Sequence, residues 1–159
     1  MAFEIVRKEE LARWGISEEN VIIPTRKTKE SAGYDIHIPN KYIAGIVKNE
    51  KSRFKIPTGI KCKFPLSKDK LYLQISLKSG FSVKYPFMLT NGIGIIDSDY
   101  YNNPDNDGHI LLSMYNYSDA WVSIPDNGIG IAQGIFVNYL TFGERIEEQR
   151  VGGFGSTSK

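Results

Sequence analysis

Short apolar runs, rich in β-branched and aromatic residues, recur along most of this chain. Gly, Pro, Asn, Asp and Lys separate one run from the next. β-branched and aromatic side chains fit the pleated surface of a sheet, whereas Gly, Pro, Asn and Asp favour tight turns. The pattern predicts short strands at residues 21–24, 34–38, 42–47, 52–56, 59–64, 71–76, 88–90, 94–96, 110–115, 120–124 and 129–137.

One segment near the N-terminus has a helical pattern. Between Lys8 and Trp14, Leu11 and Trp14 are spaced to share one face, and Gly15 follows as a stop. Many short strands with so little helix are typical of a sandwich, a jelly roll or a small barrel, and not of an alternating α/β sheet. We therefore expect an all-β protein with a distorted jelly-roll or β-barrel-like body.

Composition and charge narrow the class of protein. The 159 residues suffice for one domain with a substantial core, and 41% hydrophobic with 24% charged residues is typical of a globular protein. The formal net charge of +2 gives no field that would favour wrapping a nucleic-acid backbone. We expect no nucleic-acid partner, although a nucleotide monomer would require no such field.

Cysteine, histidine and the N-terminus exclude further classes. A single cysteine, Cys62, excludes an internal disulfide, and with only His37 and His109 it makes no plausible zinc site. The N-terminus lacks an apolar signal core, and no apolar run approaches membrane-spanning length. We expect a protein of the cytoplasm, in its own or a host's cytosol, with no membrane partner.

The last ten residues combine groups that a nucleotide triphosphate would need. Three glycines bring backbone N–H groups close to a ligand, Ser156 and Thr157 offer hydroxyls, Arg150 is a permanent cation, and Phe154 is a flat aromatic surface. A disordered polar terminus is the other interpretation. Because the strand pattern ends in charged residues from Glu144 onward, we expect a β domain at 1–145 and a flexible glycine-rich arm at 146–159.

A second informative stretch is residues 91–100, NGIGIIDSDY. Gly92 and Gly94 interrupt a strand pattern, which often marks a bulge or the close approach of a ligand. Asp97 ends an apolar run. Its carboxylate either forms a turn or acts as a base in a partly dry pocket.

Five short motifs occur in a fixed order along the chain. They are SAGYD at 31–35, LKSG at 77–80, NGIGIIDSDY at 91–100, IAQ at 131–133 and GGFGST at 152–157. Each alone is weak, but together they make the chain resemble the trimeric dUTPases, the deoxyuridine triphosphate nucleotidohydrolases, over nearly its whole length. The resemblance implies a homotrimer with shared active sites and an arm that closes over bound nucleotide.

The resemblance also implies a reaction. The protein would hydrolyse dUTP to dUMP and pyrophosphate, which limits uracil incorporation into DNA and supplies dUMP for dTMP synthesis. Asp97 would deprotonate a water that attacks the α-phosphorus, with Mg²⁺ neutralising the departing pyrophosphate. Asp35 would act on the metal indirectly, through a water; the other interpretation is an Asp that fixes a turn.

Substrate contacts follow motif by motif. Tyr100 would lie beneath the deoxyribose and exclude a ribose 2′-hydroxyl; alternatively it is a core aromatic. A tight pocket would leave no space for the methyl group of thymine, and cytosine would present the wrong hydrogen-bonding edge. The implied substrate-binding residues are Lys78, Ser79, Gly80 and Gln133 for phosphates, Asn91, Gly94, Ile96 and Tyr100 for base and sugar, and Arg150, Phe154, Gly155, Ser156 and Thr157 from the arm.

Two departures from the family pattern leave alternatives open. Lys78 stands where the family usually has Arg, so a two-pronged phosphate contact becomes a point charge. Residues 101–108 are longer than usual, and form a plain hairpin loop, a lid rim or a surface for a regulatory protein partner. Two other functions are a dCTP deaminase of the same superfamily and a binding protein that nucleotide occupancy switches.

Overall fold

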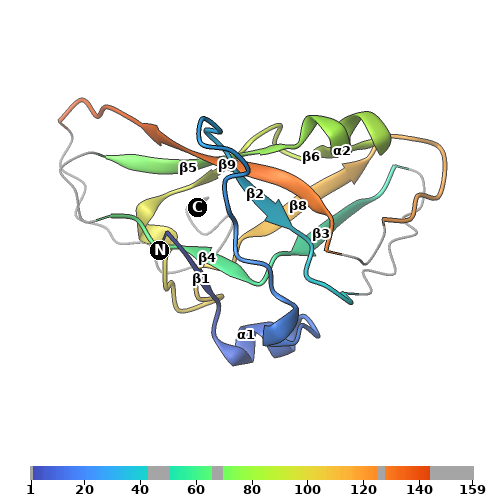
Figure 1. The fold of residues 1–159 in the computed structure, drawn as a ribbon, viewed down its shortest axis with the longest axis horizontal. Coiled ribbons are helices and arrows are strands. Elements are labelled where there is room, and N and C mark those ends of the chain that lie inside the picture. Colours follow the sequence, from blue (N-terminus) through green and yellow to red (C-terminus); the bar gives the residue numbers. More distant parts are fainter. Residues whose placement is uncertain (1, 43–50, 66–69, 125–127, 144–159) are drawn as a thin grey trace.

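Antiparallel strands build most of the protein. The computed structural model describes residues 2–42, 51–65, 70–124 and 128–143. Within these residues the strands form a two-stranded sheet in the order β1-β4, a four-stranded sheet β2-β9-β5-β7 and a three-stranded sheet β3-β8-β6. Figure 1 shows helix α1 on the opposite side of the molecule from strands β5 and β9. The body is therefore all-β and jelly-roll-like, as expected.

The elements have these bounds. The strands are β1 Phe3–Ile5, β2 Tyr34–His37, β3 Arg53–Pro57, β4 Ile60–Cys62, β5 Leu71–Leu77, β6 Phe87–Leu89, β7 Gly94–Ile96, β8 Leu111–Asn116 and β9 Gly130–Asn138. The helices are α1 Lys8–Arg13 and α2 Ser79–Lys84, with 3₁₀ turns η1 Glu18–Asn20 and η2 Ser98–Tyr100.

The position of β6 and β7 matters for the site. These strands follow each other in the chain, yet β6 pairs with β8 in one sheet and β7 pairs with β5 in another. The residues between them, 90–93, must therefore cross from one sheet to the other. A hairpin that spans two sheets leaves space between the sheets beside its turn.

The core lies between the inner faces of the sheets. Alternate residues of β5, Leu73 and Ile75, are almost fully buried, and they face Ile56 and Met114 from the three-stranded sheet across one continuous hydrophobic cluster. Full burial of one such side chain contributes about 1.5 to 3 kcal/mol. The two-residue period of a half-buried strand thus sets which side chains of β5 remain available on the outer face.

Most of the predicted elements are confirmed, at Lys8–Arg13 and in strands β2 to β9. The predictions for 21–24 and 120–124 are wrong. Val21, Ile23 and Val122 do pack against the core, but their segments form no named strand. An alternating pattern reports which side chains are buried, and not whether a neighbouring strand pairs with the backbone. The predicted strand 42–47 lies almost entirely outside the described residues.

The sequence pattern missed two elements, β1 and α2. Strand β1 has three residues and pairs with β4, far along the chain, with Phe3 opposite Cys62. Helix α2, SGFSVK, is six residues long and carries Gly80 in its first turn. Neither segment is long enough to show a period. No helix within the described residues is long and apolar enough to cross a membrane.

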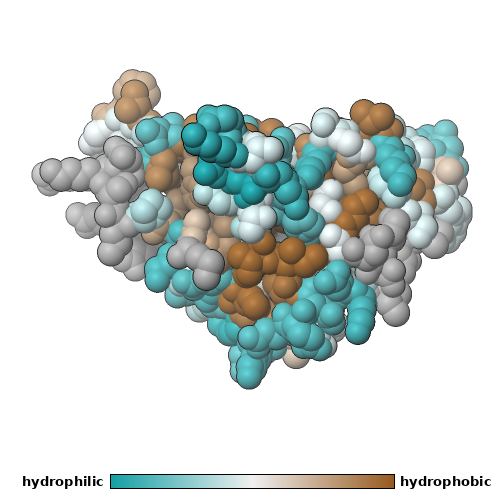
Figure 2. All heavy atoms as spheres, in the orientation of Figure 1, coloured by the Kyte–Doolittle hydropathy of each residue, from teal (hydrophilic) through white to brown (hydrophobic). Residues whose placement is uncertain are grey.

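The surface is polar over much of its area. Figure 2 shows polar residues in teal between several brown hydrophobic areas, one of them at the upper left, over the segment that follows β9 in Figure 1. Leu140 and Phe142 in this segment are 95% and 97% exposed. Apolar side chains this exposed contact nothing substantial within the described part of the chain.

Candidate active site

A narrow pocket lies beside the turn that crosses between the sheets. Its volume is about 170 Å³, and its lining includes three residues expected from the sequence to contact a base or sugar: Asn91, Gly94 and Ile96. The remaining walls come from both sheets, with Ile75 from β5, Leu89 and Thr90 from β6 and its end, and Leu111, Leu112 and Ser113 from β8. The hairpin therefore brings Asn91, Gly94 and Ile96 together, whereas Tyr100, the fourth residue predicted for base and sugar, is not among the residues that line this pocket.

Backbone geometry shapes this pocket. Gly94 pairs with Ile75, and a Cβ atom at Gly94 would lie 3.2 Å from the Cβ atom of Ile75. In the turn, the Thr90 N–H donates to the Ser113 carbonyl oxygen at 3.0 Å, and the Gly92 N–H to that of Leu89 at 3.0 Å. Gly92 has a φ of +76°, which glycine adopts without strain. A side chain at position 94 would push against the pocket wall.

Asp97 lies where β7 ends. It is half-buried, and its backbone carbonyl accepts the Tyr100 N–H at 3.1 Å, which closes the turn η2. The Asp97 side chain forms no capping hydrogen bond with this turn. The backbone thus makes the turn, and the carboxylate of Asp97 is not needed for it. A catalytic role for the carboxylate stays a prediction.

A second polar group spans the four-stranded sheet. Asp35 in β2 lies opposite Gln133 in β9, which lies opposite Ser76 in β5, so the three side chains share one face. The Lys78 Nζ atom binds Asp35 Oδ2 at 2.5 Å, and Gln133 Nε2 reaches Ser76 Oγ at 3.5 Å. We call Asp35, Lys78 and Gln133 the sheet cluster. The structure places Asp35 within a strand, paired with a cation, instead of fixing a turn.

Glycines make room for the sheet cluster. A Cβ atom at Gly33 would lie 2.7 Å from Gln133 Oε1, and one at Gly130 would lie 3.3 Å from the ring of His37 and 3.6 Å from Lys78 Cδ. Burial lowers the pKa of His37 from its ordinary value, and the positive charges of Lys27 and Lys78 lower it further. The imidazole therefore favours its neutral form beside Lys78.

Ser79 and Gly80 follow Lys78 at the start of helix α2, and both are exposed. The Lys78 N–H donates to the Ile131 carbonyl oxygen at 3.0 Å, which ties the start of α2 to β9. The LKSG and IAQ motifs are therefore side by side in the fold. The structure brings Lys78, Ser79, Gly80 and Gln133 to one end of β5.

Asp97 lies at the other end of β5 within the same chain. The register places Ile96 opposite Leu73, so Asp97 leaves the sheet beside Tyr72, six positions from Lys78. At about 3.4 Å per residue, this separates them by about 20 Å along the strand. A single chain does not bring Asp97 to the sheet cluster.

Tyr100 is buried, with 2% of its surface exposed. Its hydroxyl donates to the His109 carbonyl oxygen at 3.1 Å and accepts a hydrogen bond from Asn106 Nδ2 at 2.8 Å. The ring belongs to the hydrophobic core, in agreement with the alternative interpretation of a core aromatic. Contact with a deoxyribose stays a prediction and would involve the ring alone, because the hydroxyl is taken up by the protein.

Residues 101–108 are not a plain hairpin loop. Asn103, Asn106, Asp107 and Gly108 are buried. Asp107 accepts hydrogen bonds from the Arg7 N–H at 2.7 Å and from Lys61 Nζ at 2.9 Å. The sequence signal for this structure was the density of Asn and Asp before a glycine, which favours side chain to backbone bonds. The exposed part that a regulatory partner could reach is small, at Asn102, Pro104 and Asp105.

The described residues of this site fit a metal ion that the substrate carries. Among the described residues, no group of three or more His, Cys, Asp or Glu side chains could hold a metal. Asp35 is the carboxylate of the sheet cluster, and Lys78 already neutralises it. Mg²⁺ often keeps several waters and binds through substrate phosphates with one or two carboxylates. These residues fit such an ion with a water between it and Asp35.

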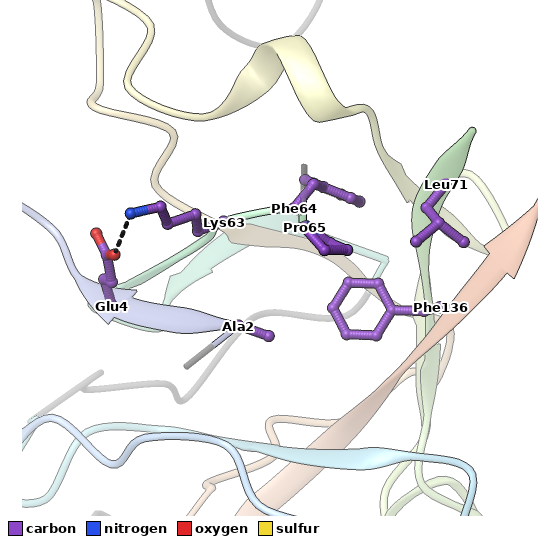
Figure 3. A pocket seen from close by; sticks show the side chains of 7 residues that line it. All are labelled: Ala2, Glu4, Lys63, Phe64, Pro65, Leu71 and Phe136. Carbon is purple, nitrogen blue, oxygen red and sulfur yellow. Dashed lines mark ion pairs between the residues drawn. The ribbon is translucent and has the colours of Figure 1, made fainter. Parts of the chain in front are cut away.

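A larger pocket, of about 650 Å³, lies elsewhere. Its walls include Phe64, Leu71 and Phe136, and the ion pair of Lys63 Nζ with Glu4 Oε1 at 3.6 Å lies at its edge (Figure 3). None of the residues predicted for the site line it. We assign base binding to the smaller pocket because Asn91, Gly94 and Ile96 line it.

Part of the expected site falls outside the described residues. The residues predicted to close over the nucleotide, Arg150, Phe154, Gly155, Ser156 and Thr157, all lie in the segment 144–159, as does the expected arm 146–159.

Comparisons with known proteins show the family to which this chain belongs. The dUTPase family model matches residues 19–158. The deoxyuridine 5'-triphosphate nucleotidohydrolase of Lactococcus lactis is 38% identical over 160 residues, covering 98% of this chain and 95% of the relative. That of Leptospira interrogans is 30% identical over 147 residues, covering 87% and 92%.

Solved structures share the fold. The dUTPase from Streptococcus mutans superposes with a TM-score of 0.70 at 29% identity, covering 89% of this chain and 98% of the other. The Staphylococcus bacteriophage 80alpha dUTPase with dUPNHPP gives a TM-score of 0.63 at 19% identity, covering 99% and 97%. From the match of the family model to most of its length and from these relatives, the chain belongs to the dUTPase family.

Proposed function

We propose that Asp97 activates the water with which this enzyme, a dUTP diphosphatase, hydrolyses dUTP to dUMP and pyrophosphate. The observation that carries the proposal is the pocket beside the β6–β7 turn, where Asn91, Gly94 and Ile96 line one narrow space and the same strand leads directly to Asp97. A base in this pocket would leave the sugar and α-phosphate on the Asp97 side. The reaction lowers dUTP, and so uracil incorporation into DNA, and supplies dUMP for dTMP synthesis.

Base selection would rest on backbone groups. The 91–96 segment presents N–H and carbonyl groups beside a pocket of about 170 Å³. Uracil offers acceptor, donor and acceptor along its edge, so a fixed backbone can match it. The amino group of cytosine would oppose a donor and leave buried polar atoms unpaired. The extra methyl group of thymine would press on a tight wall, where even a Cβ atom added at Gly94 would lie 3.2 Å from Ile75.

In the chemical step, the carboxylate of Asp97 would accept a proton from the attacking water as its oxygen bonds to the α-phosphorus. The bond from that phosphorus to the bridging oxygen then breaks, and pyrophosphate departs. Partial burial of Asp97 weakens competition from bulk water and strengthens its pull on the proton. Mg²⁺, when bound to the phosphates, supplies neutralising charge for the leaving pyrophosphate.

The phosphate contacts would come from another copy of the chain, in a homotrimer with shared sites. Along β5, Lys78 lies about 20 Å from Asp97 of the same chain and Gln133, opposite Ser76, about 14 Å, by the rise of an antiparallel strand. A triphosphate whose α-phosphorus meets Asp97 would be too short to reach Lys78 of the same chain. The exposed Leu140 and Phe142 fit a surface that a neighbouring copy covers.

Lys78 and Asp35 would change partners when substrate binds. In the free protein Lys78 neutralises Asp35. A triphosphate with Mg²⁺ offers Lys78 a stronger anion and offers Asp35 the water shell of a cation. The lysine is 32% exposed, so this exchange requires little rearrangement.

The C-terminal arm completes the proposal. By resemblance to the family, residues 146–159 would close over the nucleotide bound to the 1–145 domain. Phe154 and Gly155 would cover the base, and Arg150, Ser156 and Thr157 would contact the γ-phosphate. Deleting residues 150–159 should abolish most turnover and leave the melting temperature almost unchanged. Normal turnover by the truncated enzyme would contradict this role.

A steady-state assay tests the function itself. We expect pyrophosphate release from dUTP, with little from UTP, dCTP or dTTP. Ammonia release from dCTP would indicate the deaminase chemistry of the same superfamily instead. Comparable rates on all four substrates would contradict the proposed base pocket.

A further inference from the structure

We propose that Asn106, with Asn103, is a positioning residue that holds Tyr100 in the orientation needed to select deoxyribose over ribose. This inference rests on the proposed function and on the contact of the Tyr100 ring with the deoxyribose that the family resemblance predicts. The 101–108 segment would then contribute to substrate specificity indirectly, because none of its residues touches the substrate.

Two asparagines hold Tyr100 at both ends. At the phenol, Asn106 Nδ2 donates to the hydroxyl at 2.8 Å, and the hydroxyl donates to the His109 carbonyl oxygen at 3.1 Å. At the backbone, Asn103 Nδ2 donates to the Tyr100 carbonyl oxygen at 2.9 Å. A ring fixed at its tip and at its own backbone has little freedom to tilt.

The amide groups of Asn103 and Asn106 are themselves fixed. Asn103 Nδ2 also donates to Asn106 Oδ1 at 2.8 Å, and that oxygen accepts the Gly108 N–H at 3.2 Å. Asn103 Oδ1 accepts the backbone N–H groups of Asp105 and Asn106 at 3.2 and 3.1 Å. Asn103 is 3% exposed and Asn106 5%. Buried amides with both ends bonded keep one orientation.

The carbonyl oxygen that receives the Tyr100 hydroxyl is anchored in turn. The His109 ring is fully buried, its Nε2 atom accepts the Gly59 N–H at 2.9 Å, and its Nδ1 atom lies 2.9 Å from Glu10 Oε1. Because Nε2 accepts, the proton lies on Nδ1 and is donated to Glu10. We call Glu10, Asn103, Asn106 and His109 the tyrosine brace. It connects Tyr100 to helix α1.

Selection against a single hydroxyl requires a wall that does not move. A ribose 2′-hydroxyl is excluded only if the Tyr100 ring cannot yield to it, and a ring that yields admits UTP. Gly108 supports the same close packing, because a Cβ there would lie 2.8 Å from the Tyr100 carbonyl oxygen. The brace thus provides rigidity at the point where discrimination would depend on it.

The test compares kcat/KM for dUTP and for UTP in Asn106→Ala, Tyr100→Phe and the double variant. Each single variant removes the same hydrogen bond from one side. We expect each to narrow the preference for dUTP by about 3- to 10-fold, the size of one lost hydrogen bond. The double variant should lower the preference for dUTP no further than the more affected single variant does, because both changes remove the hydrogen bond between Asn106 and Tyr100. Asp105→Ala, an exposed change in the same segment, should keep the wild-type preference.

The preference is the ratio of kcat/KM for dUTP to kcat/KM for UTP on one enzyme sample. Partial unfolding of a variant lowers both values equally and leaves the ratio unchanged. A wild-type preference in both Asn106→Ala and Tyr100→Phe would overturn the inference, even if their melting temperatures fell. If Asn106→Ala does not fold, Tyr100→Phe decides alone, because it leaves the asparagines in place. Tyr100→Ala separates the two proposals. If Tyr100→Ala keeps the preference for dUTP over UTP, Tyr100 has no part in the site. If Tyr100→Ala loses this preference but Tyr100→Phe keeps it, only the role of the brace is contradicted.

Discussion

The sheet cluster and the tyrosine brace use similar residues and differ in burial and completeness. In the sheet cluster, Lys78 is partly exposed, and the contact of Gln133 with Ser76 is long, at 3.5 Å. Nearby, His37 Nδ1 is buried without a hydrogen-bond partner among the described contacts. In the brace, the amide nitrogens of Asn103 and Asn106 and both ring nitrogens of His109 are bonded within 3.2 Å. The buried Glu10 Oε2 has an ion pair with Arg13 but no hydrogen bond among the described contacts.

This difference separates binding from positioning. Polar groups that are exposed to solvent and have unused hydrogen-bonding positions can exchange a protein partner for a ligand. Buried groups with complete partners cannot, since losing a partner leaves an unsatisfied group that costs about 1 to 3 kcal/mol. Changes at the partly exposed Lys78 should therefore reduce activity more than stability. Changes in the brace should reduce stability first.

Asp97 belongs to neither cluster and should give the largest effect. Asp97→Asn keeps the size and the backbone turn but removes the base, so turnover should fall by about 100- to 10,000-fold. Substrate affinity and the melting temperature should change little. Steady-state kinetics and thermal unfolding measure both. Asp99→Asn, an exposed change in the same turn, is the matched control, and near-normal turnover by Asp97→Asn would remove this residue from catalysis.

Glu10→Ala should break the brace. The substitution removes the acceptor of the His109 Nδ1–H and of Trp14 Nε1, which lies 2.9 Å from Glu10 Oε1. It also removes the ion pair of Glu10 Oε2 with Arg13 at 3.1 Å. We expect a loss of about 2 to 4 kcal/mol in the free energy of unfolding, measured by urea denaturation.

Glu9→Ala, at an exposed position of the same helix, should change the free energy of unfolding by less than about 0.5 kcal/mol. If Glu10→Ala and Glu9→Ala had the same free energy of unfolding, the brace would not be the buried hydrogen-bonded network that distinguishes it from the sheet cluster.

Lys78→Ala should reduce activity more than stability. Without its charge, kcat/KM for dUTP should fall by about 10- to 100-fold, because charge-assisted bonds contribute about 1.5 to 3 kcal/mol. The free energy of unfolding should fall by about 1 to 3 kcal/mol at most, because Lys78 is partly exposed but the buried Asp35 loses its cation. Lys78→Arg should restore activity. A clear loss of stability with unchanged kcat/KM would reverse the comparison.

The smallest effect concerns pH. Burial lowers the pKa of His109 from its ordinary value near 6.5, although Glu10 and Asp107 oppose the shift and Arg13 adds to it. The unfolded chain therefore takes up a proton at higher pH than the folded protein. Stability contributed by neutral His109 is complete above about pH 6.5 and declines as the pH falls below it, by at most about 1.4 kcal/mol per unit.

Urea unfolding between pH 7.5 and 5 would measure this slope. His109→Gln should flatten it, whereas His37→Gln should remove only the separate contribution of His37, whose pKa is also lowered. An unchanged slope in His109→Gln would show that the brace does not hold this imidazole neutral.

Local sequence was sufficient for the pocket hairpin. Asn91, Gly94, Ile96 and Asp97 are close in the chain, so any hairpin built from that segment gathers them. The same holds for most strands, because alternation of buried and exposed residues is a local property. The alternation failed to predict structure at residues 21–24, where Val21 and Ile23 are partly buried against the core but the segment forms no named strand.

By itself, then, the sequence determined the strand-rich body, the turn glycines, the order of the five motifs and the candidates for the reacting groups. Only the tertiary structure decided which of these groups meet. Antiparallel pairing brought Asp35 beside Gln133 and Lys78, register placed Asp97 at the far end of β5, and burial converted residues 101–108 from a loop into a support for Tyr100. The physical reason is that propensity and periodicity act over a few residues, whereas pairing, register and burial depend on contacts between segments far apart in the chain.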